Sequence, residues 1–277
     1  MAEFPVGIST MSYMFTHSAH ACLDHLADKG FRLFELVVFP PHIWPTTLDE
    51  ATKREIATLV ADRGLTITSL CYPVLDNNIN SPVPEMRRFT IDMYKRVIDL
   101  AGDWGVPRVL VLPGPMHPYF HPPFEWLMEW FAEGIRELSP HARGAGVKLL
   151  VENIQYTFLP TVADIVRALD EIGDETIGMN YDVGNAVIAG RDPAEELRLN
   201  MDRIGLVHVA DVNHPDENRK IPIGTGTIDY AAIAETFRAV NYSGPSMLEV
   251  ITDEDRDAKM VASCAALAKL GWAPLAG

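Results

Sequence analysis

The chain has 277 residues, of which 48% are apolar and 22% are charged, and its formal net charge at pH 7 is −15. A chain of this length and composition buries a large core, so it needs no disulfide or metal to fold and is not intrinsically disordered. The negative charge argues against a nucleic-acid partner, because proteins with such partners gather Lys and Arg along a phosphate-binding surface.

The cysteines and the apolar runs indicate the cellular compartment of the protein. The chain has three cysteines, Cys22, Cys71 and Cys264, and none of them forms a CxxC pair with another. This pattern is typical of a protein in a reducing compartment without a disulfide framework. No apolar run approaches the ~20 residues that span a bilayer, and the N-terminal residues lack a signal-peptide pattern. We therefore expect a soluble, cytoplasmic protein with no membrane partner.

Short runs rich in Val, Ile and Leu alternate along the chain with longer stretches of helical periodicity. We predict strands at 4–9, 33–38, 66–70, 108–112, 148–151, 177–181, 205–209 and 246–250. We predict helices near 17–29, 48–62, 84–104, 122–144, 161–171, 193–201, 229–239 and 254–270. Most of these strands are almost continuously apolar, as in a parallel sheet whose two faces are both buried.

Residues typical of helix ends support this division. Thr47 lies three residues before Glu50, which is the capping-box pattern, and Asp192 precedes Pro193 at another predicted helix start. Glycines at 30, 64, 105, 146 and 173 each lie a few residues before a strand, where a helix would end.

Eight strand–helix units match a (β/α)8 TIM barrel, an α/β fold of typically about 250 residues. A doubly wound open sheet is the alternative. That fold usually has a Gly-rich turn after its first strand, and residues 9–15 contain no glycine. The barrel is therefore the preferred prediction, as one domain over residues 1–277, since no linker-like segment divides the chain.

Four polar side chains end or lie within consecutive predicted strands: Glu152, Asp182, His208 and Glu249. The active site of a barrel lies at the carboxyl ends of its strands, so the four can converge on one centre. A divalent metal ion would reduce their formal charge from −3 to −1 and relieve the repulsion between carboxylates. The oxygen-rich set favours Mn²⁺, Mg²⁺ or Co²⁺, with Zn²⁺ as an alternative. The alternative is that the four residues form no metal site, and that each one only ends its own strand or pairs with an arginine.

Other polar residues near strand ends are candidate substrate contacts. Glu35 fits a substrate contact and a structural partner of a barrel arginine equally well. His117 fits a loop contact to a hydroxyl group as well as an ordinary surface histidine. Asn153 and Asn185 closely follow two of the candidate metal ligands, so they fit a supporting or a substrate-binding role.

The long loop predicted after 205–209 contains a further candidate. Arg219 could bind a hydroxyl, carboxylate or phosphate oxygen of a substrate. Asp211 fits an orienting partner of His208 or a cap of the following loop. The glycines at 224 and 226 are too few for a nucleotide-binding loop and fit a turn into the next helix.

The motifs resemble the xylose isomerase-like superfamily of sugar isomerases, epimerases and endonuclease IV-type barrels. The matching stretches are LLVEN at 149–153, NYDVG at 180–184, LVHVAD at 206–211, PIGTGTIDY at 222–230 and MLEV at 247–250. The resemblance covers essentially the whole chain. It implies that Glu152, Asp182, His208 and Glu249 are the metal ligands, and that Glu152 and Glu249 also act as acid and base.

Two departures separate the chain from branches of that superfamily. Ketose 3-epimerases carry a histidine where this chain has Asn185 and a glutamate where it has Phe158. These differences argue against a simple ketohexose 3-epimerase. The endonuclease branch needs further histidines for a three-metal cluster, so a DNA-repair activity is also disfavoured.

The resemblance implies a divalent-metal-dependent isomerase or epimerase of a small sugar or keto-sugar. One glutamate would remove a proton next to a carbonyl, and the metal would stabilise the resulting enediolate. A lyase uses the same residues and stays open, either as an inosose or dehydroshikimate dehydratase or by eliminating an aglycone from a 3-keto glycoside. A non-enzymatic sugar-binding barrel is a third hypothesis. We expect an unphosphorylated substrate, and a homo-oligomer is compatible with the sequence, which identifies no contact face.

Overall fold

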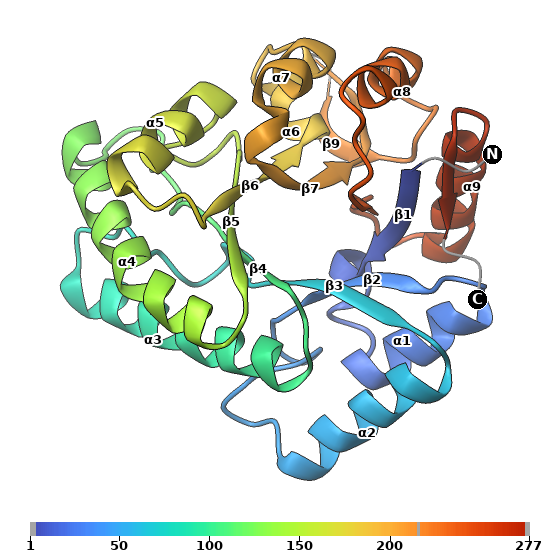
Figure 1. Ribbon diagram of the computed structural model, residues 1–277, viewed down its shortest axis with the longest axis horizontal. Coiled ribbons are helices and arrows are strands. Elements are labelled where there is room, and N and C mark those ends of the chain that lie inside the picture. The colour runs from blue at the N-terminus through green and yellow to red at the C-terminus, as the bar shows by residue number, and fades with distance from the viewer. Residues whose placement is uncertain (1–3, 215–216, 275–277) are drawn as a thin grey trace.

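A computed structural model describes residues 4–214 and 217–274 as a ring of strands surrounded by helices (Figure 1). The strands in these residues are β1 (Phe4–Ser9), β2 (Leu33–Val37), β3 (Thr66–Cys71), β4 (Arg108–Val111), β5 (Lys148–Glu152), β6 (Gly178–Asp182), β7 (Ile204–Val209), β8 (Asp211–Asn213), β9 (Glu217–Ile221), β10 (Ser246–Leu248) and β11 (Trp272–Pro274). The helices are α1 (Ala19–Asp28), α2 (Glu50–Asp62), α3 (Pro84–Asp103), α4 (Phe124–Gly144), α5 (Val162–Ile172), α6 (Val183–Ile188), α7 (Pro193–Asn200), α8 (Tyr230–Ala239) and α9 (Arg256–Ala268), with 3-10 turns η1 (Thr10–Tyr13) and η2 (Met201–Arg203).

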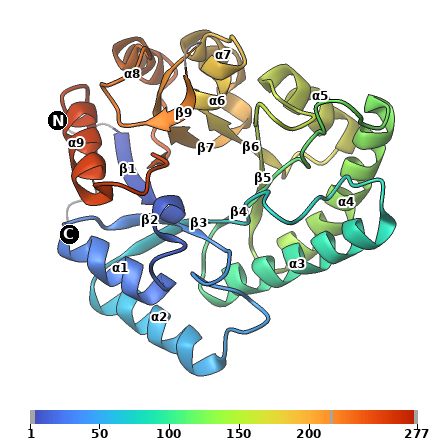
Figure 2. The ribbon, with the colours of Figure 1, turned by 180° about the vertical axis from the view of Figure 1, so that it is seen from behind.

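The main sheet closes on itself. Its strands follow the order β10-β7-β6-β5-β4-β3-β2-β1, and β1 pairs in parallel with β10, placing Val6 beside Ser246 and Ile8 beside Leu248. Figure 2 shows from behind that the helices lie outside this ring. The predicted TIM barrel is confirmed, and β11 adds a short parallel pairing to β1.

The interior of the barrel has an apolar layer beneath a polar one. Leu33, Leu150, Leu206 and Met247 form a buried cluster separate from the larger core between strands and helices. Side chains two positions apart on a strand share a face. Glu35, Glu152, His208 and Glu249 therefore follow these apolar residues at the carboxyl ends of the same strands. The apolar layer closes the barrel below them and makes them the floor of a site.

Helix boundaries agree with the predicted ones to within a few residues, but one cap differs. The predicted capping role of Thr47 is wrong, because Asp49 is the N-cap of α2 and accepts a hydrogen bond from the Thr52 N–H at 2.8 Å. Asp192 caps α7 as predicted, through bonds from Ala194 and Glu195 N–H. The five predicted helix-ending glycines all have positive φ angles.

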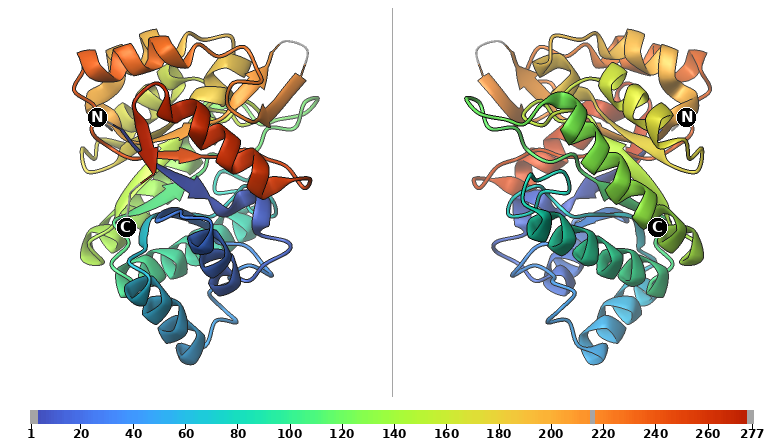
Figure 3. Two further views of the ribbon diagram at one scale, coloured as in Figure 1. Left: turned by 90° about the vertical axis from the view of Figure 1, so that its right-hand side faces the viewer. Right: turned by 90° about the vertical axis from the view of Figure 1, so that its left-hand side faces the viewer.

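The predicted loop after β7 contains regular structure. β8 and β9 pair as an antiparallel hairpin, which extends from one end of the barrel in orange in Figure 3. The six residues of α6 directly after β6 were also not predicted. Both elements are too short for hydrophobic periodicity to reveal them.

The state of the cysteines and the character of the helices were both expected from the sequence. Cys22, Cys71 and Cys264 are buried and free, so none forms a disulfide. Among the helices of residues 4–214 and 217–274, none is long and apolar enough to span a bilayer.

Asp211 fixes the start of the hairpin to the turn that leads into α8. Its buried carboxylate accepts hydrogen bonds from Gly224 N at 2.9 Å, Gly226 N at 3.0 Å and Ile228 N at 3.1 Å. A side chain at Gly226 would clash, because its Cβ would lie 2.4 Å from Asp211 Oδ1. Of the two roles expected for Asp211, capping the loop is the one observed.

Replacing Asp211 with Asn tests this anchor. An amide nitrogen cannot accept these N–H groups, so D211N should lower the free energy of unfolding by about 2 kcal/mol, measured by urea denaturation. D229N is the matched control, because Asp229 is an exposed N-cap of α8 and Asn caps equally well. Equal stability of the two variants would contradict the anchoring role.

Candidate functional site

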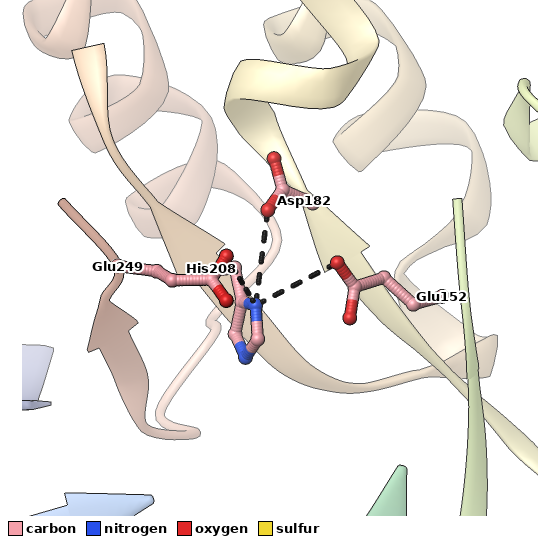
Figure 4. Close-up of side chains that lie close together, drawn as sticks. All are labelled: Glu152, Asp182, His208 and Glu249. Carbon is pink, nitrogen blue, oxygen red and sulfur yellow. Dashed lines mark ion pairs between the residues drawn. The ribbon is translucent and has the colours of Figure 1, made fainter. Parts of the chain in front are cut away.

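The four residues singled out at the strand ends converge on one point. Glu152 ends β5, Asp182 ends β6, His208 lies in β7 and Glu249 directly follows β10. One ligand atom from each lies within 4.8 Å of the others, and all four side chains are buried. Figure 4 shows the three carboxylates arranged around one nitrogen of His208, with the dashed lines marking ion pairs.

The other nitrogen of His208 is held by Glu35. His208 Nε2 lies 3.1 Å from Glu35 Oε2, which also accepts a hydrogen bond from Ser69 Oγ at 2.9 Å. Because a carboxylate can only accept, Nε2 donates to Glu35 and Nδ1 is the nitrogen that faces the cluster, where loss of its proton would leave a lone pair for a cation. Glu35 is thus the partner of a histidine, not of the arginine considered from the sequence.

His208 Nδ1 is the buried atom at the centre. It lies 3.3 Å from Glu249 Oε2, 3.7 Å from Asp182 Oδ2 and 3.8 Å from Glu152 Oε1. It has no hydrogen-bond partner among the described residues. A buried nitrogen that points at three carboxylates without a bond of its own is the arrangement expected of a metal ligand.

Lys220 brings a positive charge to the same carboxylates. Its ammonium group, on β9, lies 2.5 Å from Asp182 Oδ2 and pairs with Glu249 Oε2. The side chain is only 10% exposed. Burial opposes the charge of Lys220, but Asp182, Glu249 and Glu152 outweigh it and raise the pKa of the amine well above its usual value.

The glutamates of the cluster differ in their electrostatic surroundings. Burial raises the pKa of Glu152 to about 8, against the opposing charges of His208 and Lys220. Burial acts on Glu249 in the same direction, but Lys220 and His208 outweigh it and hold the pKa of Glu249 below its usual value. Lys220 and His208 act on both glutamates, and the closer contact of Glu249 with the two positive groups accounts for the difference.

Asparagine amides hold the carboxylates in place. Asn180 Nδ2 donates to Glu152 Oε2 at 3.0 Å, and Asn185 Nδ2 donates to Asn153 O at 2.9 Å. Asn153 bonds the main-chain N–H and carbonyl of Asp182 at 2.8 and 3.0 Å. Asn153 thus joins the ends of β5 and β6, a supporting contact of the kind expected from its sequence position.

Asp182 divides its two oxygens between structure and site. Oδ1 accepts from Asn185 N at 2.7 Å and caps α6, while Oδ2 faces Lys220 and His208. The short helix α6 therefore begins here because Asp182 provides an N-cap acceptor. This geometry leaves one oxygen of Asp182 for a ligand.

A cavity of about 530 Å³ lies over the cluster. Glu152, Asn185, Arg219, Lys220 and Glu249 are among the residues that line it. Of the expected substrate contacts, Asn185 and Arg219 therefore reach the cavity.

His117 is not brought to that cavity. It is exposed, and its Nδ1 accepts hydrogen bonds from Tyr119 N and Phe120 N at 3.2 Å. Those bonds order its own loop after β4. Glu35 and Asn153 are buried beside the cluster and do not line the cavity either.

Lys220 is a residue of the site that the sequence analysis does not single out. Neighbouring residues on a strand point to opposite sides, so Lys220 faces the cluster while Arg219 is more exposed. The alternation predicts the direction of Lys220 only if residues 217–221 are recognised as a strand. The sequence predicts a loop there, so it does not predict this contact.

The donor set fits a divalent cation. Three carboxylates and one imidazole nitrogen provide hard oxygen ligands and one borderline nitrogen, and the lysine already among them shows that the position favours positive charge. The cluster could therefore hold a metal ion, whose identity these ligands alone do not fix.

Two curated relatives cover most of the chain. It is 25% identical over 213 residues to a protein of Escherichia coli K12 named putative L-ribulose-5-phosphate 3-epimerase SgbU. The aligned region covers 75% of this chain and 74% of the relative. It is 24% identical over 251 residues to the L-ribulose-5-phosphate 3-epimerase UlaE of Shigella flexneri, with 87% of each chain covered.

Solved structures share the fold across nearly the whole chain. A D-tagatose 3-epimerase-like protein superposes with a TM-score of 0.83 at 21% identity, covering 96% of this chain and 97% of the other. The 3-keto-D-glucoside 4-epimerase YcjR of E. coli gives a TM-score of 0.79 at 22% identity, covering 96% and 98%. At such identities the likeness concerns the fold.

A family model settles the relationship at the level of the superfamily. The model of the xylose isomerase-like TIM barrel matches residues 23–270, which include every residue of the buried cluster. The resemblance read from the sequence motifs is confirmed, and the chain belongs to the xylose isomerase-like TIM barrel family.

Proposed function

We propose that the protein is a divalent-metal-dependent epimerase of a keto-sugar. The observation that carries this proposal is the buried cluster of Glu152, Asp182, His208 and Glu249 at the base of a cavity. The names of the relatives, which are epimerases of ribulose phosphate and other sugars, support the same reaction class.

The four residues of the cluster would hold the metal, with His208 binding through Nδ1. When bound, the cation would supply the positive charge that stabilises negative charge developing on a carbonyl and a neighbouring hydroxyl oxygen. Mn²⁺, Mg²⁺ or Co²⁺ would suit this ligand set, with Zn²⁺ as the alternative.

The residues of the chain would then carry the proton transfers. Glu152 and Glu249 extend from β5 and from the end of β10, so each can meet the substrate from a different side of the barrel. One would remove a proton from the carbon next to the carbonyl, and the other would return a proton to the opposite face. Asn185 and Arg219, which also line the cavity, would orient hydroxyl groups.

Glu249→Gln tests the acid–base assignment. The amide cannot take a proton, so kcat should fall by about 10²–10⁴-fold while the fold is kept. Turnover of a ketose panel by the Mn²⁺-loaded protein measures this loss. The matched control is E254Q, an exposed glutamate five residues away, which should keep full activity. Full activity of E249Q would exclude Glu249 from the reaction.

Lys220→Met tests the positive charge within the cluster. In EDTA the variant leaves three buried carboxylates without their ammonium partner, which should lower stability by about 3–5 kcal/mol. Saturating Mn²⁺ should restore more stability to K220M than to the wild type, measured by thermal unfolding with and without metal. The control K53M removes a surface ion pair with Glu50 and should respond to EDTA as the wild type does. If EDTA changed the thermal stability of K220M and of the wild type equally, then no metal ion would bind beside the ammonium group of Lys220.

Glu35→Gln tests the orientation of His208. Loss of the carboxylate that holds Nε2 should weaken Mn²⁺ binding by about 10–100-fold, measured by isothermal titration calorimetry. S69A removes the other hydrogen-bond donor to Glu35 without changing charge and serves as the comparison. If the Mn²⁺ affinity of E35Q equalled that of the wild type, Glu35 would not be orienting His208 as a metal ligand.

A further inference from the structure

The cavity changes in chemical character with distance from the carboxylate cluster. Its volume of about 530 Å³ falls within the ~300–1,000 Å³ of pockets that hold drug-sized ligands. The charged groups Glu152, Glu249 and Lys220 gather at the cluster, whereas apolar side chains predominate in the rest of the lining. The cavity thus has room for more than the reacting part of a sugar.

Large apolar side chains reach the surface at this cavity. Phe15 is 63% exposed, Leu75 is 50% exposed and Ile251 is 43% exposed, and all three line it, together with Met11 and Met14. Exposed apolar side chains gathered at one cavity mark a binding surface more often than chance exposure does. A ligand that covers them would remove apolar area from water.

Two hydroxyl side chains near these residues, those of Ser12 and Thr252, are already occupied. Ser12 Oγ donates to Val250 O at 2.7 Å and accepts from Thr252 N at 2.9 Å. Thr252 Oγ1 donates to Glu254 O at 3.0 Å and accepts from Lys259 Nζ at 2.8 Å. These two hydroxyl groups are therefore not available to a sugar, and burying sugar hydroxyls without partners costs free energy.

One free acceptor stands out among the polar residues of the lining. Gln155 Oε1 is buried and has no hydrogen-bond partner in the described part of the chain. Gln155 lies three residues after Glu152 and lines the cavity, so its side-chain amide can hydrogen-bond a hydroxyl group of a substrate whose carbonyl end lies at the cluster. This assigns the hydroxyl-bearing part of the ligand to the β5 side of the cavity.

A phosphate group has weak support in the same cavity. Among the described lining residues the cations are Arg219 and Lys220, and Lys220 already pairs with Asp182 and Glu249. Asp253 adds a carboxylate to the lining. A phosphate dianion prefers several N–H donors and cations, so this lining does not favour one.

We propose that the substrate is a keto-sugar carrying an apolar alkyl or aryl substituent. This inference rests on the proposed function and specifies its substrate class. The carbonyl end would lie at the carboxylate cluster, the amide of Gln155 would hydrogen-bond a hydroxyl group, and the substituent would cover Phe15, Leu75 and Ile251. The apolar substituent contributes affinity that a free monosaccharide cannot obtain from this lining.

Matched glycosides test the proposal. Methyl and octyl 3-keto-β-D-glucosides share the reacting sugar and differ in the apolar chain, and L-ribulose with its 5-phosphate tests the phosphate. With the Mn²⁺-loaded protein, kcat/KM should be at least about 10-fold higher for the octyl than for the methyl compound, since each buried methylene can strengthen binding about fourfold. The phosphate should give no gain over L-ribulose.

Variants locate the effect in the cavity. The double variant F15S/I251S should bring the octyl-to-methyl ratio of kcat/KM close to one. L199S, which alters a 69% exposed leucine on α7 outside the cavity lining, should keep the wild-type ratio. A wild-type ratio near one, or a 10-fold preference for the phosphorylated ketose, would overturn the proposal.

A binding measurement separates this proposal from the proposed reaction. The thermal shift given by methyl and octyl β-D-glucosides needs no turnover, and a larger shift with the octyl compound supports the apolar site even if no epimer forms. Failure of every compound to react would then contradict the epimerase assignment alone. Equal shifts with the two glucosides would contradict the apolar site alone.

Discussion

Repulsion among three buried carboxylates is the constraint on which the site depends. Glu152, Asp182 and Glu249 lie within a few ångströms of one another, where water screens their charges poorly. Such a group persists only beside positive charge or with a proton on one member. Lys220 provides positive charge from the chain itself, and the orphaned Nδ1 of His208 marks where a cation would gain a fourth ligand.

The barrel supplies the positions that this constraint requires. Three of the four strands that carry the cluster place an apolar residue two positions before the polar one, as in Leu150 before Glu152 and Leu206 before His208. In β6 that position holds Asn180, whose amide binds Glu152. The apolar layer excludes water from below, and the amides of Asn180 and Asn185 fix the carboxylate oxygens from the side. The same alternation along each strand therefore builds both the core and the site.

The sequence predicts the barrel and the cluster because each residue in them is set by a local pattern. A short apolar run ending in Glu152 or Asp182 indicates a buried strand and a polar terminus at once. The role of Glu35 could not be predicted, since its partner His208 lies 173 residues away and several partners fit a buried glutamate. Lys220 was missed because β9 is a five-residue strand in a hairpin, with no apolar period to distinguish it from a loop.

Proton NMR in D₂O tests the central claim most directly. The Mn²⁺-loaded protein would be offered ketoses and 3-keto glucosides, and the spectra followed over time. The account predicts solvent deuterium at a carbon next to the carbonyl, together with the appearance of the epimer. A vinylic signal or a released aglycone would show a lyase instead, and the absence of any exchange with every compound would contradict proton transfer at this site.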